Sequence, residues 1–346
     1  MSTPIYNFSA GPAVLPACVR ESLKADLTNY ANTGRSIIEI SHRSATYQAL
    51  MDELNANLRT LLGVGQDRTI LLLQGGASGQ FAMLPYNFLR EGAAADYLVR
   101  GYWGEKAAQQ AARIGRITRR ETLGQWNDQA VYAHVTTNET IAGTALPEDF
   151  TPPTIPLCAD MSSDILAAPR DYNKYHLFYA GTQKNLGVAG LALVVIENEF
   201  LSQARRNLPA AFCYLEHAKA NGIYHTPNAF AICALYRVTQ WLLQETPEKI
   251  WETNKRKAEK LYAEIDRSPL WRPLAPKNER SITNVTFRLP TEDLEQRFLA
   301  EAEARGLCAL KGHRALGGVR VSIYNAMPEK GVDNLIEFMQ YFEARA

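Results

Sequence analysis

The sequence predicts an α/β protein built on a mostly parallel β-sheet. Three apolar runs of strand length lie close together, at residues 155–159, 176–180 and 191–196. Polar, acidic or glycine-rich residues bound each run, as is typical of buried strands in α/β sheets. Asp160 and Lys184 stand just past the first two runs. Ligands of open α/β sheets bind beyond the carboxyl ends of strands, so this carboxylate and this amine are expected to face one ligand.

Other elements follow from apolar spacing and from turn residues. Strands are expected at 69–74, 96–99, 131–135, 282–289, 307–310 and 319–324, and helices at 17–27, 47–61, after the glycine turn at 75–76, from 226 onward, and at 248–266, 294–305 and 332–344. Residues 210–220 show no clear period and are expected to be irregular, and residues 114–131 to form a short surface excursion. We expect two domains, a large one at 16–247 and a small one formed by 1–15 and 248–346.

Composition excludes several classes of protein. The chain has 346 residues, of which 46% are hydrophobic, so it can bury a large core. Its formal net charge of +1, with both signs evenly mixed, gives no field that attracts nucleic acid or an anionic membrane. Five cysteines without a CxxC pair indicate reduced thiols in a cytoplasmic protein. The sequence has no signal-peptide pattern and no run long enough to span a bilayer, so we expect neither secretion nor membrane insertion.

The pairing of Asp160 with Lys184 suits pyridoxal phosphate, whose aldehyde needs a lysine and whose ring nitrogen needs an acid. The acid keeps that nitrogen protonated through a charge-assisted hydrogen bond. The lysine, once the substrate amine displaces it, becomes the base that moves the substrate α-proton. Spacing alone leaves open the alternative that both residues are solvated loop positions.

The glycine turn at 75–76 leads from a predicted strand into a predicted helix. Glycines let backbone amides approach an anion, and a helix N-terminus adds unpaired N–H groups. Ala77 and Ser78 are therefore placed to bind a phosphate, with a plain tight connection as the alternative. The turn lacks the GK[ST] of a P-loop and does not fit GxGxxG, which argues against nucleotide binding.

A basic loop near the C-terminus is the best signal for substrate recognition. Residues 311–320, KGHRALGGVR, place Lys311, His313, Arg314 and Arg320 among three glycines. A substrate with two anionic ends needs separate cationic sites, and this loop can supply them. A solvated basic loop remains the alternative on the residues alone.

Four stretches together resemble the phosphoserine aminotransferase family, which consists of class V, fold-type I pyridoxal phosphate enzymes. They are SAGPAVLP near the start, ADMSSDI, YAGTQKNLGVAGL, and KGHRALGGVRVSIYNAMP near the end. The resemblance runs in order from Tyr6 to the last predicted helix. It implies a large domain with a mostly parallel seven-stranded sheet, a small α/β domain, no metal, and a homodimer with shared active sites.

The resemblance also implies the roles of individual residues. Lys184 and Asp160 are the catalytic pair, Trp103 stacks on the cofactor ring, and Thr140 contacts it near the phenolic oxygen. The remaining cofactor contacts are Gly76, Ala77, Ser78, Ser162 and Gln183, together with His225 and Thr226, which reach the neighbouring subunit's cofactor phosphate. The implied substrate contacts are Ser9, His42 and Arg43, the last two reaching the neighbouring site, with His313 and Arg314 on phosphate and Arg320 on the α-carboxylate.

The implied reaction passes an amino group from glutamate to 3-phosphohydroxypyruvate, giving O-phosphoserine and 2-oxoglutarate in serine biosynthesis. Family members often also act on 4-phosphohydroxythreonine in vitamin B6 biosynthesis, and that role stays open. Ser78, His225 and the short 114–131 segment depart from the family pattern. They suggest as an alternative a class V aminotransferase for another phosphorylated or phosphonate keto acid. A regulatory cofactor-binding protein and a nucleotide-dependent enzyme are the rivals outside this class.

Overall fold

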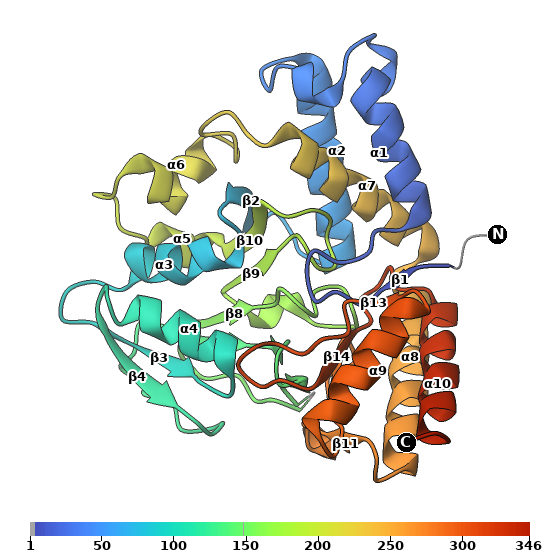
Figure 1. Ribbon diagram of the computed structural model, residues 1–346. Coiled ribbons are helices and arrows are strands. Elements are labelled where there is room, and N and C mark those ends of the chain that lie inside the picture. Colours follow the sequence, from blue (N-terminus) through green and yellow to red (C-terminus); the bar gives the residue numbers. More distant parts are fainter. Residues whose placement is uncertain (1–3, 148) are drawn as a thin grey trace.

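A seven-stranded sheet forms the centre of the molecule in a computed structural model that describes residues 4–147 and 149–346 (Figure 1). The strand order is β2-β10-β9-β8-β5-β3-β4. Strand β10 runs antiparallel to both of its neighbours, and the other adjacent pairs are parallel. The predicted α/β fold with a mostly parallel sheet is therefore confirmed. The strands are β2 (Arg68–Gln74), β3 (Ala94–Leu98), β4 (Arg116–Arg120), β5 (Ala133–Thr136), β8 (Leu157–Asp160), β9 (Leu177–Gly181) and β10 (Leu191–Glu197).

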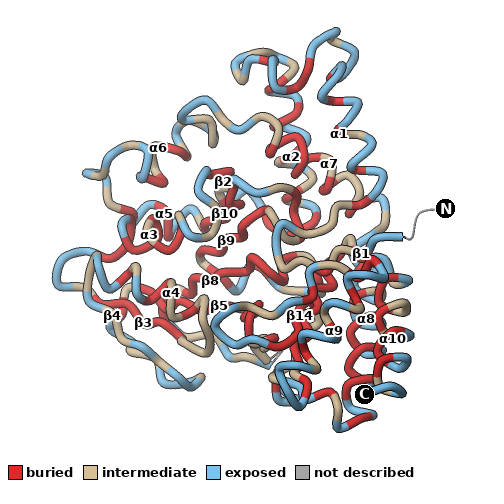
Figure 2. The backbone as a smooth tube through the Cα atoms, in the orientation of Figure 1, coloured by how far each residue is buried: buried red, intermediate tan, exposed pale blue. Residues whose placement is uncertain are grey.

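Helices cover both faces of this sheet because its strands are apolar on both sides. Successive residues of a strand point to opposite faces, and in β10 Leu193 and Val195 join one core while Ala192 and Val194 join the other. The strands are accordingly buried along most of their length (Figure 2). The first core is completed by α1 (Ala17–Asn29), α2 (Ala45–Leu62) and α7 (Ala229–Glu245), and the second by α3 (Gly76–Phe88), α4 (Tyr102–Ala111) and α5 (Asn198–Ser202).

The C-terminal part of the chain has its own sheet and its own core. Its antiparallel sheet has the order β11-β12-β14 and packs with three helices. The N-terminal strand β1 (Tyr6–Asn7) pairs in parallel with β13 (Leu307–Cys308) of this part, and Phe8 enters its core. The other elements are α8 (Pro247–Arg267), β11 (Arg272–Pro273), β12 (Asn284–Arg288), α9 (Glu292–Ala304), β14 (Val319–Ser322) and α10 (Glu329–Glu343).

Two local predictions need correction. Residues 210–220 are not irregular, because they contain helix α6 (Tyr214–Lys219). Contacts with α3 hold this short helix, since the Tyr214 hydroxyl donates to Gln80 Oε1 at 2.7 Å and the Tyr214 amide donates to Asn87 Oδ1 at 3.0 Å. Residues 114–131 contribute strand β4 at the edge of the sheet, where half-exposed arginines concealed the strand pattern.

No helix within residues 4–147 and 149–346 combines the length and the apolar character needed to cross a membrane.

Candidate active site

A cavity of about 540 Å³ lies beyond the carboxyl ends of the parallel strands. Asp160 ends β8, the 182–190 loop with Lys184 follows β9, and the glycine turn follows β2. The strands thus deliver residues far apart in the sequence to one place, as expected for an α/β sheet. Eight of the residues predicted to contact a cofactor line this cavity: Gly76, Ala77, Ser78, Trp103, Asp160, Ser162, Gln183 and Lys184.

Lys184 presents its amine to the cavity. Its Nζ donates to Thr140 Oγ1 at 2.9 Å and lies 5.8 Å from the centroid of the Trp103 ring. Burial lowers the pKa of this amine and the Arg320 guanidinium adds to the lowering, whereas Asp160 and Glu139 oppose it. A lysine with a lowered pKa is more often unprotonated and therefore more nucleophilic.

Asp160 is buried, with 4% of its surface exposed, and is fixed by its own loop. Its Oδ1 accepts hydrogen bonds from the Ser162 amide at 2.9 Å and the Ser162 hydroxyl at 2.6 Å. The same hydroxyl accepts from the Gly181 amide at 3.0 Å, which ties this loop to β9. Burial raises the pKa of Asp160, while Lys184 and the Ser162 bonds oppose the shift. Such a carboxyl is poised to pair with a cation inside the cavity.

The glycine turn brings the start of α3 to the cavity wall. Gly75 and Gly76 have φ values of 101° and 59°, in the region that favours glycine. The Gly75 amide donates to the Gly190 carbonyl at 3.2 Å, joining this turn to the loop that carries Lys184. The first turn of α3, with Ala77 and Ser78, presents its free backbone amides there, as an anion site requires.

Glu139 is a site residue that the sequence analysis missed. Its carboxylate accepts from the amides of Trp103 at 3.0 Å and Gly104 at 2.8 Å, and so holds the start of α4. Burial raises the pKa of Glu139. A Cβ on Gly101 would lie 2.5 Å from Glu139 Cδ, so this approach needs glycine. The glycines that flank Trp103 were the only signal for it in the sequence.

The predicted substrate residues lie outside the cavity wall. Arg320 is the best placed, on β14, where burial lowers the pKa of its guanidinium. Within the described residues, its side chain forms no ion pair and no hydrogen bond. The His313 ring lies 5.1 Å from the Tyr102 ring, beside Trp103, while Arg314 is exposed. The 311–320 loop therefore reaches the mouth of the site with uncompensated positive charge.

The remaining predicted contacts are not brought together within one chain. His42 and Arg43 precede α2, and Arg43 is exposed. Ser9 Oγ accepts from the Gly11 amide at 3.3 Å, and Gly11 lines the cavity. His225 and Thr226 are exposed beside Gln74, whose side-chain amide donates to the Thr226 carbonyl at 3.4 Å. Neither of these two residues lines the cavity.

Comparison with known families decides what kind of protein carries this site. The model of the class V aminotransferases matches residues 5–335. The chain belongs to the class V aminotransferase family. This membership accounts for the strand order of the central sheet. It also accounts for Lys184 and Asp160 lying at one cavity, as predicted.

Individual relatives of this class V aminotransferase cover nearly its whole length. The phosphoserine aminotransferase of Herpetosiphon aurantiacus is 44% identical over 99% of both chains. Among solved structures, phosphoserine aminotransferase from Bacillus circulans subsp. alkalophilus is 41% identical, with a TM-score of 0.95 over 99% of each chain. The pyridoxal phosphate-bound phosphoserine aminotransferase of Trichomonas vaginalis is 34% identical, with a TM-score of 0.91 over 97% of this chain and 100% of its own.

Proposed function

We propose that this aminotransferase uses pyridoxal phosphate to move an amino group from glutamate to 3-phosphohydroxypyruvate, giving O-phosphoserine and 2-oxoglutarate. The observation that carries the proposal is the pairing of Lys184 and Asp160 at one cavity beside an uncompensated Arg320. Full-length similarity to phosphoserine aminotransferases supports the choice of substrate. A second role on 4-phosphohydroxythreonine is compatible with the same anion sites.

The residues of the cavity fit pyridoxal phosphate. Its volume of about 540 Å³ lies within the usual range for cofactor sites. Two buried polar atoms of its wall, Trp103 Nε1 and Thr136 Oγ1, have no hydrogen-bond partner in the described chain. An amine, a carboxylate and a helix N-terminus, the three groups that the aldehyde, ring nitrogen and phosphate each need, all face the same space.

We assign the following roles. Bound pyridoxal phosphate supplies an aldehyde that carries the amino group and a ring that accepts electrons. Lys184 holds the cofactor and moves the proton at the substrate Cα. Asp160 keeps the ring nitrogen protonated, and Trp103 orients the ring by stacking. Gly76, Ala77 and Ser78 bind the phosphate through the start of α3, and Ser162, Gln183 and Thr140 complete the contacts.

Substrate selection falls to the cations. Arg320 binds the α-carboxylate that both substrates carry, through a planar fork of donors. Arg43, His313 and Arg314 bind the phosphate that only one substrate carries, and Ser9 and His42 are further substrate contacts. Burial lowers the pKa of His313, and the nearby Arg320 and Arg314 lower it further. The affinity of His313 for phosphate should therefore fall as the pH rises.

We further propose a homodimer in which each subunit completes the other's site. Arg43, His225 and Thr226 are exposed in one chain and His42 is partly exposed, which supports contacts with a second chain. Each subunit would have a large domain at 16–247 and a small domain at 1–15 and 248–346, of which residues 1–3 lie outside the described chain. Five free cysteines support a reducing, cytoplasmic setting.

Mixing two inactive variants tests the shared site. If Arg43 acts on the neighbouring subunit, mixed and reassociated Arg43→Ala and Lys184→Ala chains regain about one quarter of wild-type activity, because half the dimers gain one intact site. If Arg43 serves its own chain, mixing restores nothing. Reassociated wild-type chains, and each variant reassociated alone, are the controls.

The spectrum of the bound cofactor tests the reaction itself. Glutamate alone should convert the yellow protein to the pyridoxamine form, whereas a regulatory cofactor-binding protein would stay yellow. Borohydride reduction and peptide mapping should then find the label on Lys184. A label on another lysine contradicts the assignment. A higher kcat/KM for a phosphonate keto acid than for 3-phosphohydroxypyruvate would favour the alternative substrate.

A further inference from the structure

The β6–β7 hairpin (residues 138–145) lies on the side of the cavity where Lys184 is placed. It is formed by β6 (Asn138–Glu139) and β7 (Thr144–Ala145), which pair antiparallel. Thr140 accepts the hydrogen bond from Lys184 Nζ at 2.9 Å, and Glu139 holds the amides of Trp103 and Gly104. The Lys184 amine and the start of α4 with Trp103 are thus both held by this hairpin.

The same hairpin docks against β12 of the C-terminal sheet. Thr286 Oγ1 donates to the Ala142 carbonyl at 2.7 Å, and the Ser281 amide donates to the Gly143 carbonyl at 2.9 Å. A Cβ on Gly143 would lie 2.5 Å from Thr286 Oγ1 and 2.8 Å from the Asn284 carbonyl oxygen, so the approach leaves no room for a side chain. In the sheet register, Thr286 stands directly opposite Arg320 of β14.

A buried chain of amide and hydroxyl groups crosses the same contact. Asn138 Nδ2 donates to Ser163 Oγ and to Asn284 Oδ1, each at 2.8 Å. Ser163 belongs to the loop that follows Asp160. Asn284 Nδ2 in turn donates to Ser322 Oγ at 3.0 Å and to the Tyr324 hydroxyl at 3.2 Å, on the segment that carries Arg320. Both asparagines are at most 3% exposed, so a broken bond here leaves a costly unpaired group.

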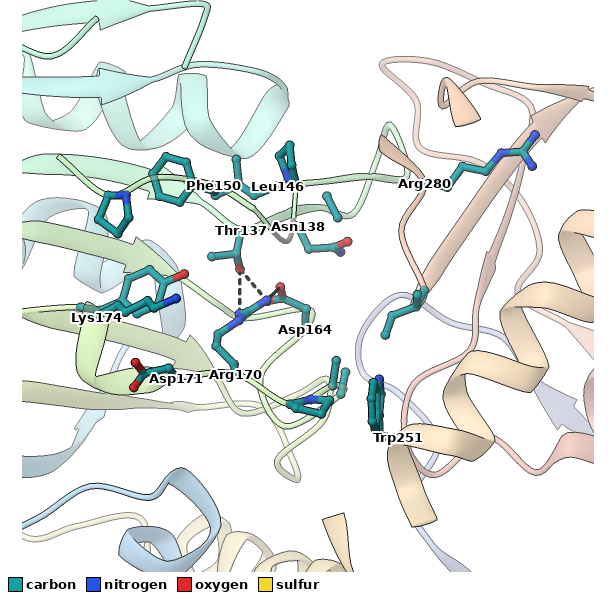
Figure 3. A pocket seen from close by; sticks show the side chains of 18 residues that line it. Thr137, Asn138, Leu146, Phe150, Asp164, Arg170, Asp171, Lys174, Trp251 and Arg280 are labelled. Atoms are coloured by element: carbon teal, nitrogen blue, oxygen red, sulfur yellow. Dashed lines mark hydrogen bonds and ion pairs between the residues drawn. The ribbon is translucent and has the colours of Figure 1, made fainter. Parts of the chain in front are cut away.

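A second cavity, of about 460 Å³, lies beside the hairpin. It lies between Thr137 and Arg170, which follow β5 and β8, and Trp251 and Arg280 of the C-terminal part (Figure 3). Asn138 lines both this cavity and the candidate active site. Directional hydrogen bonds across the hairpin, together with the close approach at Gly143, therefore fix the relative positions of the two parts beside this cavity.

We propose that Asn284 and Thr286 are positioning residues, which set the distance between Lys184 and Arg320 through the β6–β7 hairpin. Neither residue lines the cavity. The inference rests on the proposed role of Arg320 as the site for the α-carboxylate. Since both substrates carry an α-carboxylate, loosening the hairpin should weaken the binding of both substrates by the same factor. Loss of a phosphate contact should instead affect only the phosphorylated substrate.

Thr286→Val and Asn284→Ala test the proposal, with Thr239→Val as the matched control. Thr239 is a buried threonine of α7, remote from the hairpin contact, whose hydroxyl donates to the Tyr236 carbonyl at 2.7 Å and accepts from Asn57 Nδ2 at 3.3 Å. We expect Thr286→Val to lower kcat/KM about three- to tenfold, by the same factor for glutamate and for phosphoserine. The bound cofactor should keep its wild-type spectrum, because Lys184 and Asp160 are unchanged.

Hydrogen exchange of the cofactor-free protein gives a readout that needs no activity. The Ser281 amide, bonded to the Gly143 carbonyl, should exchange faster in Thr286→Val than in wild type or Thr239→Val. Thr286→Val keeps the side-chain shape, so it decides the question even where Asn284→Ala fails to fold. Unchanged exchange at Ser281, or kcat/KM values equal to those of the control, overturns the inference. A wild-type protein without the glutamate reaction contradicts the proposed function instead.

Discussion

Lys184 and Lys257 are both buried lysines, but their surroundings differ. The Nζ of Lys257, in α8, donates to the backbone carbonyls of Ile323, Tyr324 and Met327 at 3.2, 2.9 and 3.0 Å. Within residues 4–147 and 149–346, Lys184 has one hydrogen bond, to Thr140, and it faces a cavity. Burial lowers the pKa of both amines, that of Lys257 to about 7. Neither burial nor a lowered pKa by itself therefore marks a reactive amine.

The number of satisfied donors separates the two sites. An ammonium group has three N–H donors, and the three carbonyls around Lys257 engage all of them and leave no access for a ligand. At Lys184 most of the donor capacity is unused and open to the cavity. A lysine of the first kind stabilises the fold, and a lysine of the second kind is available for chemistry.

Removing the amine of Lys184 should have the largest effect. Lys184→Ala should lower the rate of the glutamate half-reaction by about 10²- to 10⁴-fold, because proton transfer at the substrate Cα loses its base. Stopped-flow absorbance of the cofactor measures this rate. Lys257→Met, assayed under conditions where it is folded, should stay within a few fold of wild type. Comparable losses in the two variants would break the distinction drawn between these lysines.

Removing the structural amine should change how stability depends on pH. The folded pKa of Lys257, about 7, lies below that of an unfolded lysine, about 10.4. Between these values the unfolded chain holds a proton that the folded protein has lost, so the free energy of unfolding rises with pH. The rise from this group is at most about 1.4 kcal/mol per pH unit.

Urea unfolding of the cofactor-free protein at pH 7, 8 and 9 measures that dependence. Lys257→Met should lack the rise, because methionine does not titrate. Lys255→Met, which changes an exposed lysine of the same helix, should keep it. Equal slopes in wild type and Lys257→Met would show that the three carbonyls keep the amine protonated throughout this range.

The smallest predicted effect concerns the hydrogen bond between Lys184 and Thr140. The hydrogen bond from Lys184 Nζ to Thr140 favours the protonated amine. Thr140→Val removes this bond, so the pKa of Lys184 should fall further. A single hydrogen bond of about 0.5–1.5 kcal/mol corresponds to a shift of at most about one pH unit. In cofactor-free protein, an acylating reagent should label Lys184 faster at neutral pH, as peptide mapping can show. Slower labelling than in wild type, or a similar change in Thr140→Ser, would contradict this.

The sequence was most informative where structure is local. Apolar runs bounded by turns predicted the sheet, and residues just past two strands predicted the Asp160 and Lys184 pair. Helix α6 escaped prediction because partners on α3, more than a hundred residues away, hold it in place. Strand β4 escaped because arginines occupy an edge strand, where charged side chains are common.

Site residues that act through other residues were also missed. Glu139 and Asn138 lie in the same stretch as Thr140, but their roles depend on contacts with Trp103 and Asn284, which no spacing rule indicates. The roles of Arg43, His225 and Thr226 remain predictions, since a single chain leaves these residues exposed.

The pairing of β1 with β13 has a consequence for the order of assembly. Tyr6 lies opposite Leu307, and only a few residues separate this pair from Gly11 at the cavity rim. On a ribosome, where a chain folds from its N-terminus as it emerges, the first strand must wait for some three hundred residues before its partner exists. Maturation of the candidate pocket is thus tied to translation beyond Cys308, because a shorter polypeptide lacks the strand that pairs with β1 beside the rim.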